Sequence, residues 1–209
     1  MRVNRIKCGM VNCFLVTDGE DAVLVDTGTK VYRKKVEEAC KKVSLSLIVL
    51  THGHGDHAGN AAYLSKRFHV PVAIHKLDYP VVQGVPTEPL KAHTLLGKIL
   101  LACSQHFLGK EKTDPFVPEV YLKQGQSLEE YGINATVIRL AGHTKGSIGL
   151  KIGMTDFIVG DALSNLFIPS LVPIYWDLDK VKQSAQVISQ SGDRMIHFGH
   201  GKSVRNRVW

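Results

Sequence analysis

The chain has 209 residues, of which 44% are hydrophobic and 22% charged, and its formal net charge is +7. This length and composition predict one globular domain with a sizeable core, and they exclude a disordered chain, a collagen-like repeat and a disulfide-stapled mini-protein. The apolar runs are too short to cross a bilayer, and the start of the chain lacks the apolar core of a signal peptide. We therefore expect a soluble, cytoplasmic protein that does not bind membranes.

The basic excess comes from 26 Lys and Arg against 19 Asp and Glu. Such an excess can attract anionic partners of several kinds. Here the basic residues form short, separated clumps, and no run reaches the five or six like charges of a nucleic-acid tail. We expect a solvated basic surface and no nucleic-acid partner.

The first part of the chain alternates strand and helix patterns. The run over 44–50 (SLSLIVL) is densely aliphatic, which is typical of a strand buried on both faces. The expected elements are, in chain order, strands over 13–18 and 22–26, a helix over 27–42, the strand over 44–50, a helix over 58–68 and a strand over 71–75.

The second part repeats this alternation after an irregular segment. Residues 80–118 contain five prolines and one apolar helical stretch at 91–108. Long insertions of this kind are usually functional, so we expect an inserted lid or cap in a single domain spanning 1–209, with a homodimer contact as the competing interpretation. The later elements are strands over 135–140, 147–153 and 156–160, a helix over 178–189 and a strand over 194–198.

The densest group of histidines directly follows the buried strand over 44–50. The segment THGHGDHAGN (51–60) places four polar side chains within six positions: His52, His54, Asp56 and His57. Imidazole and carboxylate are ligands of zinc, iron and manganese, and the intervening glycines remove side-chain bulk. A polar loop rich in histidine by chance is the bland alternative. The residue types and spacing favour a metal site.

Three further candidate ligands come at the ends of other predicted strands. His143 follows the strand over 135–140, Asp161 ends the strand over 156–160, and His200 follows the strand over 194–198. Any one of them alone would more often be a polar turn residue. Together with the first cluster they give seven side chains of compatible chemistry, which is enough for two metal positions.

These segments resemble the motifs of the metallo-β-lactamase-fold metallo-hydrolase superfamily, and within it the glyoxalase II-like enzymes. The matching segments are LVDTG (24–28), HGHGDHAGN (52–60), GHTKGS (142–147), GDAL (160–163) and GHG (199–201). The HxHxDH core is the most specific of them. The resemblance implies an α/β fold, a four-layer αββα sandwich of two mixed β-sheets with helices on the outer faces, and a site along one sheet edge.

The resemblance also implies a role for each candidate. A first metal ion would be held by His52, His54 and His143, and a second by Asp56, His57 and His200. Asp161 would bridge the two ions. Asp26, in LVDTG, would support the ligand loop without binding metal.

This ligand set implies a dinuclear hydrolase. Two divalent ions about 3.5–4 Å apart can share a bridging hydroxide that forms at neutral pH. We expect two zinc ions, with iron or manganese as the other choices, and a small acyl substrate such as a thioester, lactone or ester. Asp161 stands where many β-lactamases of the fold have cysteine, which disfavours antibiotic hydrolysis.

Two other functions stay open beside the hydrolase. A mononuclear iron oxidoreductase similar to the persulfide dioxygenases would use His52, His143 and Asp161. A nuclease is supported only by the net charge and disfavoured by the absence of an exosite arm.

The substrate and the oligomeric state are not fixed by any motif. Lys145, in GHTKGS, stands where many relatives have proline, and it could contact an anionic small-molecule substrate; an exposed loop lysine is the competing interpretation. Lys202 and Arg205 are weaker candidates of the same kind. The apolar stretch over 94–108 is compatible with a homodimer.

Overall fold

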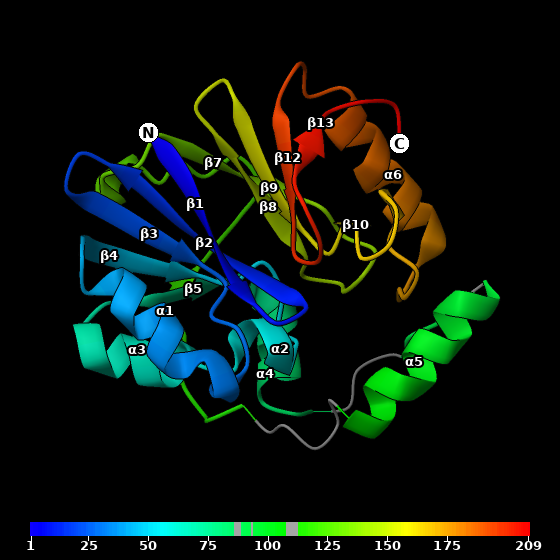
Figure 1. The fold of residues 1–209 in the computed structure, drawn as a ribbon, viewed down its shortest axis with the longest axis horizontal. Helices are drawn as coiled ribbons and strands as arrows, with labels where there is room; N and C mark the ends of the chain where they lie inside the picture. Colours follow the sequence, from blue (N-terminus) through cyan, green and yellow to red (C-terminus); the bar gives the residue numbers. More distant parts are fainter. Residues whose placement is uncertain (86–88, 93, 108–112) are drawn as a thin grey trace.

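The computed structural model of the chain describes residues 1–85, 89–92, 94–107 and 113–209. Its strands form two main sheets that pack face to face, and helices cover the outer face of each (Figure 1). These four layers confirm the predicted αββα sandwich.

The first sheet contains six strands in the order β1-β2-β3-β4-β5-β6. Their bounds are β1 Arg2–Cys8, β2 Val11–Asp18, β3 Asp21–Val25, β4 Ser44–Val49, β5 Val72–Ile74 and β6 Val120–Tyr121. The first three strands are antiparallel, and β3 to β6 are parallel, so the sheet is mixed. Parallel strands place their carboxyl ends at one edge, which is where the histidine-rich loop follows β4.

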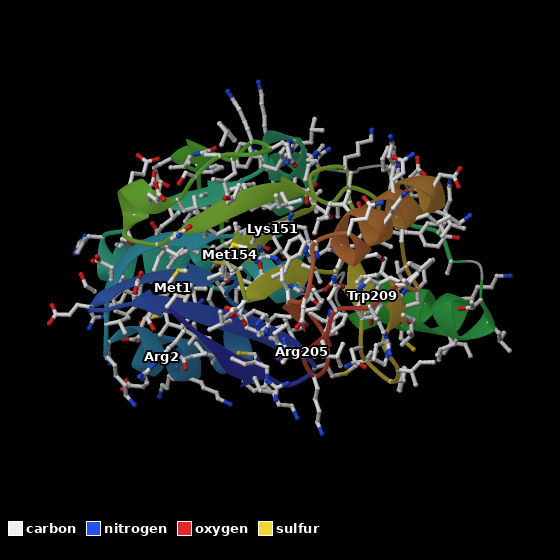
Figure 2. The ribbon with its side chains drawn as sticks, turned by 90° about the horizontal axis from the view of Figure 1, so that it is seen from above. Met1, Arg2, Lys151, Met154, Arg205 and Trp209 are labelled. Atoms are coloured by element: carbon white, nitrogen blue, oxygen red, sulfur yellow. The ribbon has the colours of Figure 1, made fainter. Side chains whose placement is uncertain are left out.

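The second sheet contains five strands in the order β13-β12-β9-β8-β7. Their bounds are β7 Ala135–Arg139, β8 Ile148–Ile152, β9 Asp156–Gly160, β12 Met195–Phe198 and β13 Val204–Arg205, and a separate pair is formed by β10 Leu163–Ser164 and β11 Ser170–Leu171. Only β9 and β12 are parallel within this sheet. Figure 2 shows Met1, the residue before β1 of the first sheet, close to Met154, which lies in the turn between β8 and β9 of the second sheet.

Side chains of the first sheet divide between two cores according to the period of two in a strand. Leu24 and Ile48 face the core shared with α1 (Arg33–Cys40) and α3 (Ala61–Phe68). Their neighbours Val23 and Leu47 face the core between the two sheets. Because both faces are covered, residues 47–50 are all aliphatic and fully buried, and the two serines lie in the less buried first half of the strand.

The outer face of the second sheet is covered by α6 (Leu178–Ser189), whose bounds match the predicted helix. The Asp177 carboxylate caps this helix by accepting two backbone N–H bonds of its first turn. Ile188 of the helix shares a core with Phe157 and Phe198 of the sheet. Trp209 packs edge-on against Phe198, with 5.7 Å between the ring centroids.

Two predicted helices are wrong in their extent, and Asn60 explains both. The helix expected over 27–42 begins only at α1, after a 3₁₀ turn over Lys30–Tyr32. The Asn60 amide donates to the carbonyl oxygens of Thr27, Gly28 and Thr29 and so holds a non-helical loop, in which Gly28 has a positive φ of 70° and Thr29 is extended. The helix expected over 58–68 is divided at Asn60 into α2 (Gly55–Ala58) and α3.

Five strands were not predicted. Four of them (β6, β10, β11 and β13) have only two residues each, too few for a sequence pattern. The fifth, β1, is an edge strand in which Arg and Lys side chains are exposed and only Ile6 and Cys8 are buried. Because most of its residues are polar, the sequence pattern did not predict this strand or its pairing with β2.

The segment over 80–118 contains the end of α4 (Tyr79–Val82) and α5 (Leu95–Phe107). Part of the predicted lid, residues 86–88, 93 and 108–112, lies outside the described residues. In Figure 1, α5 lies away from both sheets, and Leu95, Leu96 and Ile99 are exposed on it. Its role as lid or homodimer contact stays a prediction. In the described parts of the chain, no helix has the length and apolarity needed to cross a membrane.

Candidate metal centre

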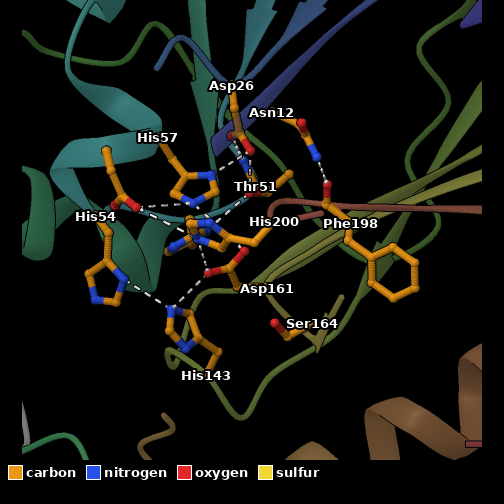
Figure 3. A network of polar contacts seen from close by, with 12 residues as sticks. Asn12, Asp26, Thr51, His54, His57, His143, Asp161, Ser164, Phe198 and His200 are labelled. Atoms are coloured by element: carbon orange, nitrogen blue, oxygen red, sulfur yellow. Dashed lines mark hydrogen bonds and ion pairs between the residues drawn. The ribbon is translucent and has the colours of Figure 1, made fainter. Parts of the chain in front are cut away.

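All seven predicted ligands meet in one largely buried cluster, and Figure 3 labels His54, His57, His143, Asp161 and His200 among them. They come from four strand ends: the loop and short helix after β4, the loop after β7, the end of β9 and the loop after β12. The two sheets place these ends side by side. Residues as far apart in the sequence as His54 and His143 are therefore neighbours, with 3.0 Å between His54 Nδ1 and His143 Nε2.

The ligand atoms form three groups, each within 4.8 Å, that could hold a metal ion. The first group is His52, His54 and His143; the second is Asp56, His57 and His200; the third is His52, His57 and Asp161. The first two are the sets that the family resemblance implies.

Asp161 lies between the first two groups. Its Oδ2 is 3.2 Å from His200 Nε2 and 3.7 Å from His143 Nε2. One carboxylate thus reaches a histidine of each group, which is the position a bridging ligand would need. Metal binding by these residues stays a prediction.

Three buried atoms in the cluster have no hydrogen-bond partner: His52 Nε2, His57 Nε2 and Asp161 Oδ1. Leaving a buried polar atom unpaired costs about 1–3 kcal/mol, so such atoms need an explanation. All three belong to the third group, which contacts both of the others. A bound metal ion would satisfy them together, so the residues present fit a metal centre.

Four of the five histidine rings are anchored by oxygen atoms at Nδ1. The contacts are His52 Nδ1 to Thr51 Oγ1 at 3.1 Å, His57 Nδ1 to Asp26 Oδ2 at 2.8 Å, His143 Nδ1 to the Ile174 carbonyl at 2.7 Å and His200 Nδ1 to the Met10 carbonyl at 3.0 Å. A carboxylate or carbonyl oxygen can only accept, so Nδ1 carries the proton in at least three rings. In the neutral form of each ring, Nε2 then carries the lone pair that a metal ligand needs.

Asp26 contacts the ligand loop at three points, and its role as support for a metal site stays a prediction. Besides His57 it accepts from the backbone N–H of Thr51 at 2.8 Å and from the Thr51 hydroxyl at 2.9 Å. Its side chain is 1% exposed, and its backbone has a positive φ of 59°. The carboxylate therefore links the end of β3 to the residue directly before His52.

Burial lowers the pKa values of histidines in the cluster, and the nearby carboxylates raise them. Burial, with the charge of His143, lowers the pKa of His54 to about 3, and burial lowers the pKa of His52 well below its usual range. Burial also disfavours the charged form of His57, but Asp56 and Asp161 outweigh it and raise its pKa to about 10. His52 and His54 are therefore neutral, and the carboxylates around the second group attract positive charge.

Three residues near the cluster were not identified from the sequence. Asp78 accepts hydrogen bonds from two of the ligand loops, Thr144 is one of its donors, and Asn60 holds the loop after β3. Asp78 had a usable signal, because it follows the predicted strand over 71–75 just as the ligands follow their strands. The other two look like ordinary turn residues.

A pocket opens on the side of the cluster formed by His54 and His143. Its other lining residues are Leu77, Asp78, Val81, Leu90, Thr144, Lys145 and Trp176. The Lys145 ammonium lies over the Trp176 ring, 5.1 Å from its centroid. The structure thus places Lys145 beside the cluster, and its contact with a substrate stays a prediction. Arg205 instead forms a surface ion pair with Asp193 at 3.0 Å.

His197, three positions before His200, has a separate set of partners. Its Nε2 is 2.7 Å from Asp156 Oδ1, and its Nδ1 is 2.8 Å from the Ser203 hydroxyl. This agrees with a residue that supports the last strand. The pair is a part-buried carboxylate–imidazole contact outside the three ligand groups.

Sequence comparison places the chain in a known family. The profile of the metallo-beta-lactamase superfamily matches residues 6–200. The chain is 30% identical over 172 residues to the hydroxyacylglutathione hydrolase GloC of Haemophilus influenzae, covering 72% of this chain and 73% of that protein.

Solved structures show the same fold. The B3 metallo-beta-lactamase BLEG-1 superposes with a TM-score of 0.74 at 20% identity, covering 98% of this chain and 94% of that one. A di-iron-bound form of TTHA1623 superposes with a TM-score of 0.68 at 23% identity and the same coverage. With a profile match from Ile6 to His200 and the ligand groups assembled on the expected fold, the chain belongs to the metallo-β-lactamase superfamily.

Proposed function

We propose that this protein is a dinuclear metal-dependent hydrolase of a small acyl substrate. The observation that carries the proposal is the convergence of seven ligand side chains, three of whose buried atoms have no partner within the protein. A mononuclear enzyme would need only about half of these ligands.

Two bound divalent ions would supply an activated water near neutral pH and polarise the acyl carbonyl. The chain's own residues prepare this chemistry. Neutral His52 and His54 offer lone pairs, and the anchored Nδ1 atoms fix the ring orientations. Asp161 reaches both groups and would hold the two positions together.

The pocket beside His54 and His143 supports an acyl substrate with an anionic end. Leu77, Val81 and Leu90 give it an apolar wall for an acyl chain, and Lys145 stands at the same pocket. The name of the relative GloC describes hydrolysis of a hydroxyacyl-glutathione thioester, which is a substrate of this general kind. We propose a thioester first, with lactones and simple esters as the next classes.

The alternative is a mononuclear iron oxidoreductase related to the persulfide dioxygenases. The di-iron-bound form of TTHA1623 supports iron as a metal that this fold accepts. All three residues of the second group, Asp56, His57 and His200, are present and in reach of one another, which favours the hydrolase.

The test is hydrolysis by protein reconstituted with zinc, manganese or iron, on a matched series of a hydroxyacyl-glutathione thioester, a lactone and a neutral ester. We expect turnover of at least one of them with zinc or manganese, and its loss in a His52→Ala variant. Asp156→Asn, which alters a carboxylate–imidazole pair outside the ligand groups, is the control that should keep activity. Oxygen uptake on a persulfide by the iron form, with no hydrolysis by any form, would overturn the proposal.

A further inference from the structure

A fully buried carboxylate lies between two of the ligand loops. Asp78, in the 3₁₀ turn after β5, is 0% exposed. Its Oδ2 accepts from the backbone N–H of Gly53 at 3.0 Å and from the Thr144 hydroxyl at 2.6 Å. Its Oδ1 accepts from the backbone N–H of Gly146 at 2.5 Å. One side chain thus joins the loop after β4 to the loop after β7.

These contacts adjoin every ligand of the first metal group. Gly53 lies between His52 and His54 in the chain, and Thr144 directly follows His143. None of the three donors to Asp78 is Asp56, His57 or His200 or a direct chain neighbour of one of them, although Gly53 lies in the same loop after β4. The second group has its own carboxylate support, since Asp26 bonds to His57.

Close approach of the Asp78 segment also accounts for two motif glycines. A Cβ at Gly146 would lie 2.3 Å from Asp78 Oδ1, and a Cβ at Gly53 would lie 2.6 Å from the Asp78 carbonyl oxygen. Either distance is far below a normal contact. Glycine at these positions lets the carboxylate come close enough to bond both loops.

Holding Asp78 there has a cost. Burial raises the pKa of its carboxyl, although the hydrogen bonds from Thr144, Gly53 and Gly146 act in the opposite direction. A buried charge of this kind is often neutral or unfavourable for stability when compared with an apolar residue. A need of the metal site for Asp78 would explain why a carboxylate lies between the ligand loops.

We propose that Asp78 is a positioning residue that sets the geometry, and hence the affinity, of the first metal group. This inference rests on the proposed metal centre. Asp78→Asn keeps the size of the side chain but has only one acceptor oxygen. Its amide N–H₂ must then face either the Gly146 N–H or the Gly53 N–H, so donor meets donor and the two loops separate.

The test measures zinc affinity by competition with a chelator in two parent proteins. His200→Ala leaves the first group complete, and His54→Ala leaves the second group complete. Supporting residues of metal ligands typically contribute 10- to 100-fold in affinity. We expect Asp78→Asn to weaken zinc binding by about 10- to 100-fold in the His200→Ala parent and by less than about twofold in the His54→Ala parent.

Thr144 provides a second variant that leaves the carboxylate in place. Thr144→Val removes one of the three donors and should weaken only the His200→Ala parent, and Thr144→Ser should restore its affinity. Asp156→Asn in both parents is the control for a general loss of stability, and it should lower melting temperature without selective loss of zinc.

The outcomes separate the inference from the function on which it rests. Equal effects of Asp78→Asn on both parents, or an effect no greater than that of Asp156→Asn, would overturn the positioning role. If Asp78→Asn does not fold, unchanged zinc affinity of Thr144→Val in the His200→Ala parent would overturn the positioning role instead. Failure of the unsubstituted chain and of both parents to bind zinc, manganese or iron would instead overturn the metal centre, and the inference with it.

Discussion

Replacing Asp26 by Asn would disturb the metal centre through the proton of one histidine. In the structure the carboxylate accepts three hydrogen bonds, one from the His57 Nδ1–H and two from Thr51. An amide oxygen can keep the bond from the Thr51 backbone. The amide N–H₂ then faces His57 Nδ1, which must become an acceptor.

The His57 proton would therefore move to Nε2, the atom that lies 3.7 Å from Asp56 Oδ2 and from Asp161 Oδ1. A protonated nitrogen cannot bind a metal, so binding would require the less favourable tautomer. Loss of such support lowers metal affinity by about 10- to 100-fold, or about 1.4–2.7 kcal/mol. The metal-free protein would also exchange a charge-assisted hydrogen bond for a neutral one, a loss of about 1 kcal/mol that for a chain of this size lowers the melting temperature by about 2–4 °C.

The assay is a two-site zinc titration against a competing chelator at pH 7.5, with thermal melts of the metal-free protein. We expect one zinc ion to be released more easily from Asp26→Asn. Asp156→Asn, which alters the similar pair with His197 at 2.7 Å, should lower the melting temperature and keep both zinc affinities within about twofold. Unchanged zinc binding in Asp26→Asn, or an equal loss in the control, would refute the reasoning.

Three further predictions concern thiols, acid stability and substrate charge. A disulfide reagent should titrate one thiol in the native protein, the exposed Cys103, and four thiols after unfolding, because the other three cysteines are buried. Burial also raises the pKa of Cys40 to about 12, so the number of thiols titrated in the native protein should be the same at pH 9. Burial, with the charge of Arg139, lowers the pKa of His75 to about 4, and its Nδ1 accepts from the Leu77 N–H. The neutral ring therefore stabilises the fold fully above about pH 6.5, and this contribution is lost as the pH falls toward 4. Solvent screens the half-buried ring, so the effect is small. In denaturant titrations, the free energy of unfolding of His75→Gln should fall between these pH values by less than that of the unsubstituted protein, with a difference under about 1 kcal/mol. Lys145→Met should raise KM about tenfold for an anionic thioester and leave a neutral ester unchanged, and equal effects on both substrates would argue against a charge contact.

The sequence predicted the fold class, the family and the ligand cluster because each depends on a strong local pattern. Metal ligands must be of a few residue types, and seven of them occur at the ends of predicted strands. The buried strand over 44–50 and the capped helix over 178–189 have equally clear patterns. The convergence of the ligands then follows from the order of strands in two sheets.

Features that depend on contacts distant in the sequence were missed. Asp78 looks like a turn residue until the fold brings it to Gly53 and Gly146. Asn60 ends one helix and delays another through bonds across about 30 residues of sequence, which no helix propensity describes. The edge strand β1 carries too many charged residues to be identified by an apolar alternation.

Anomalous X-ray diffraction at the absorption edge of the bound metal tests the dinuclear centre most directly, on crystals of protein purified without added chelator. The structure predicts two peaks about 3.5–4 Å apart, one within bonding distance of His52, His54 and His143 and the other within bonding distance of Asp56, His57 and His200. A single iron peak would contradict the dinuclear hydrolase and favour oxygen-dependent chemistry. No peak in the cluster, even after soaking with zinc, would contradict the ligand assignment itself.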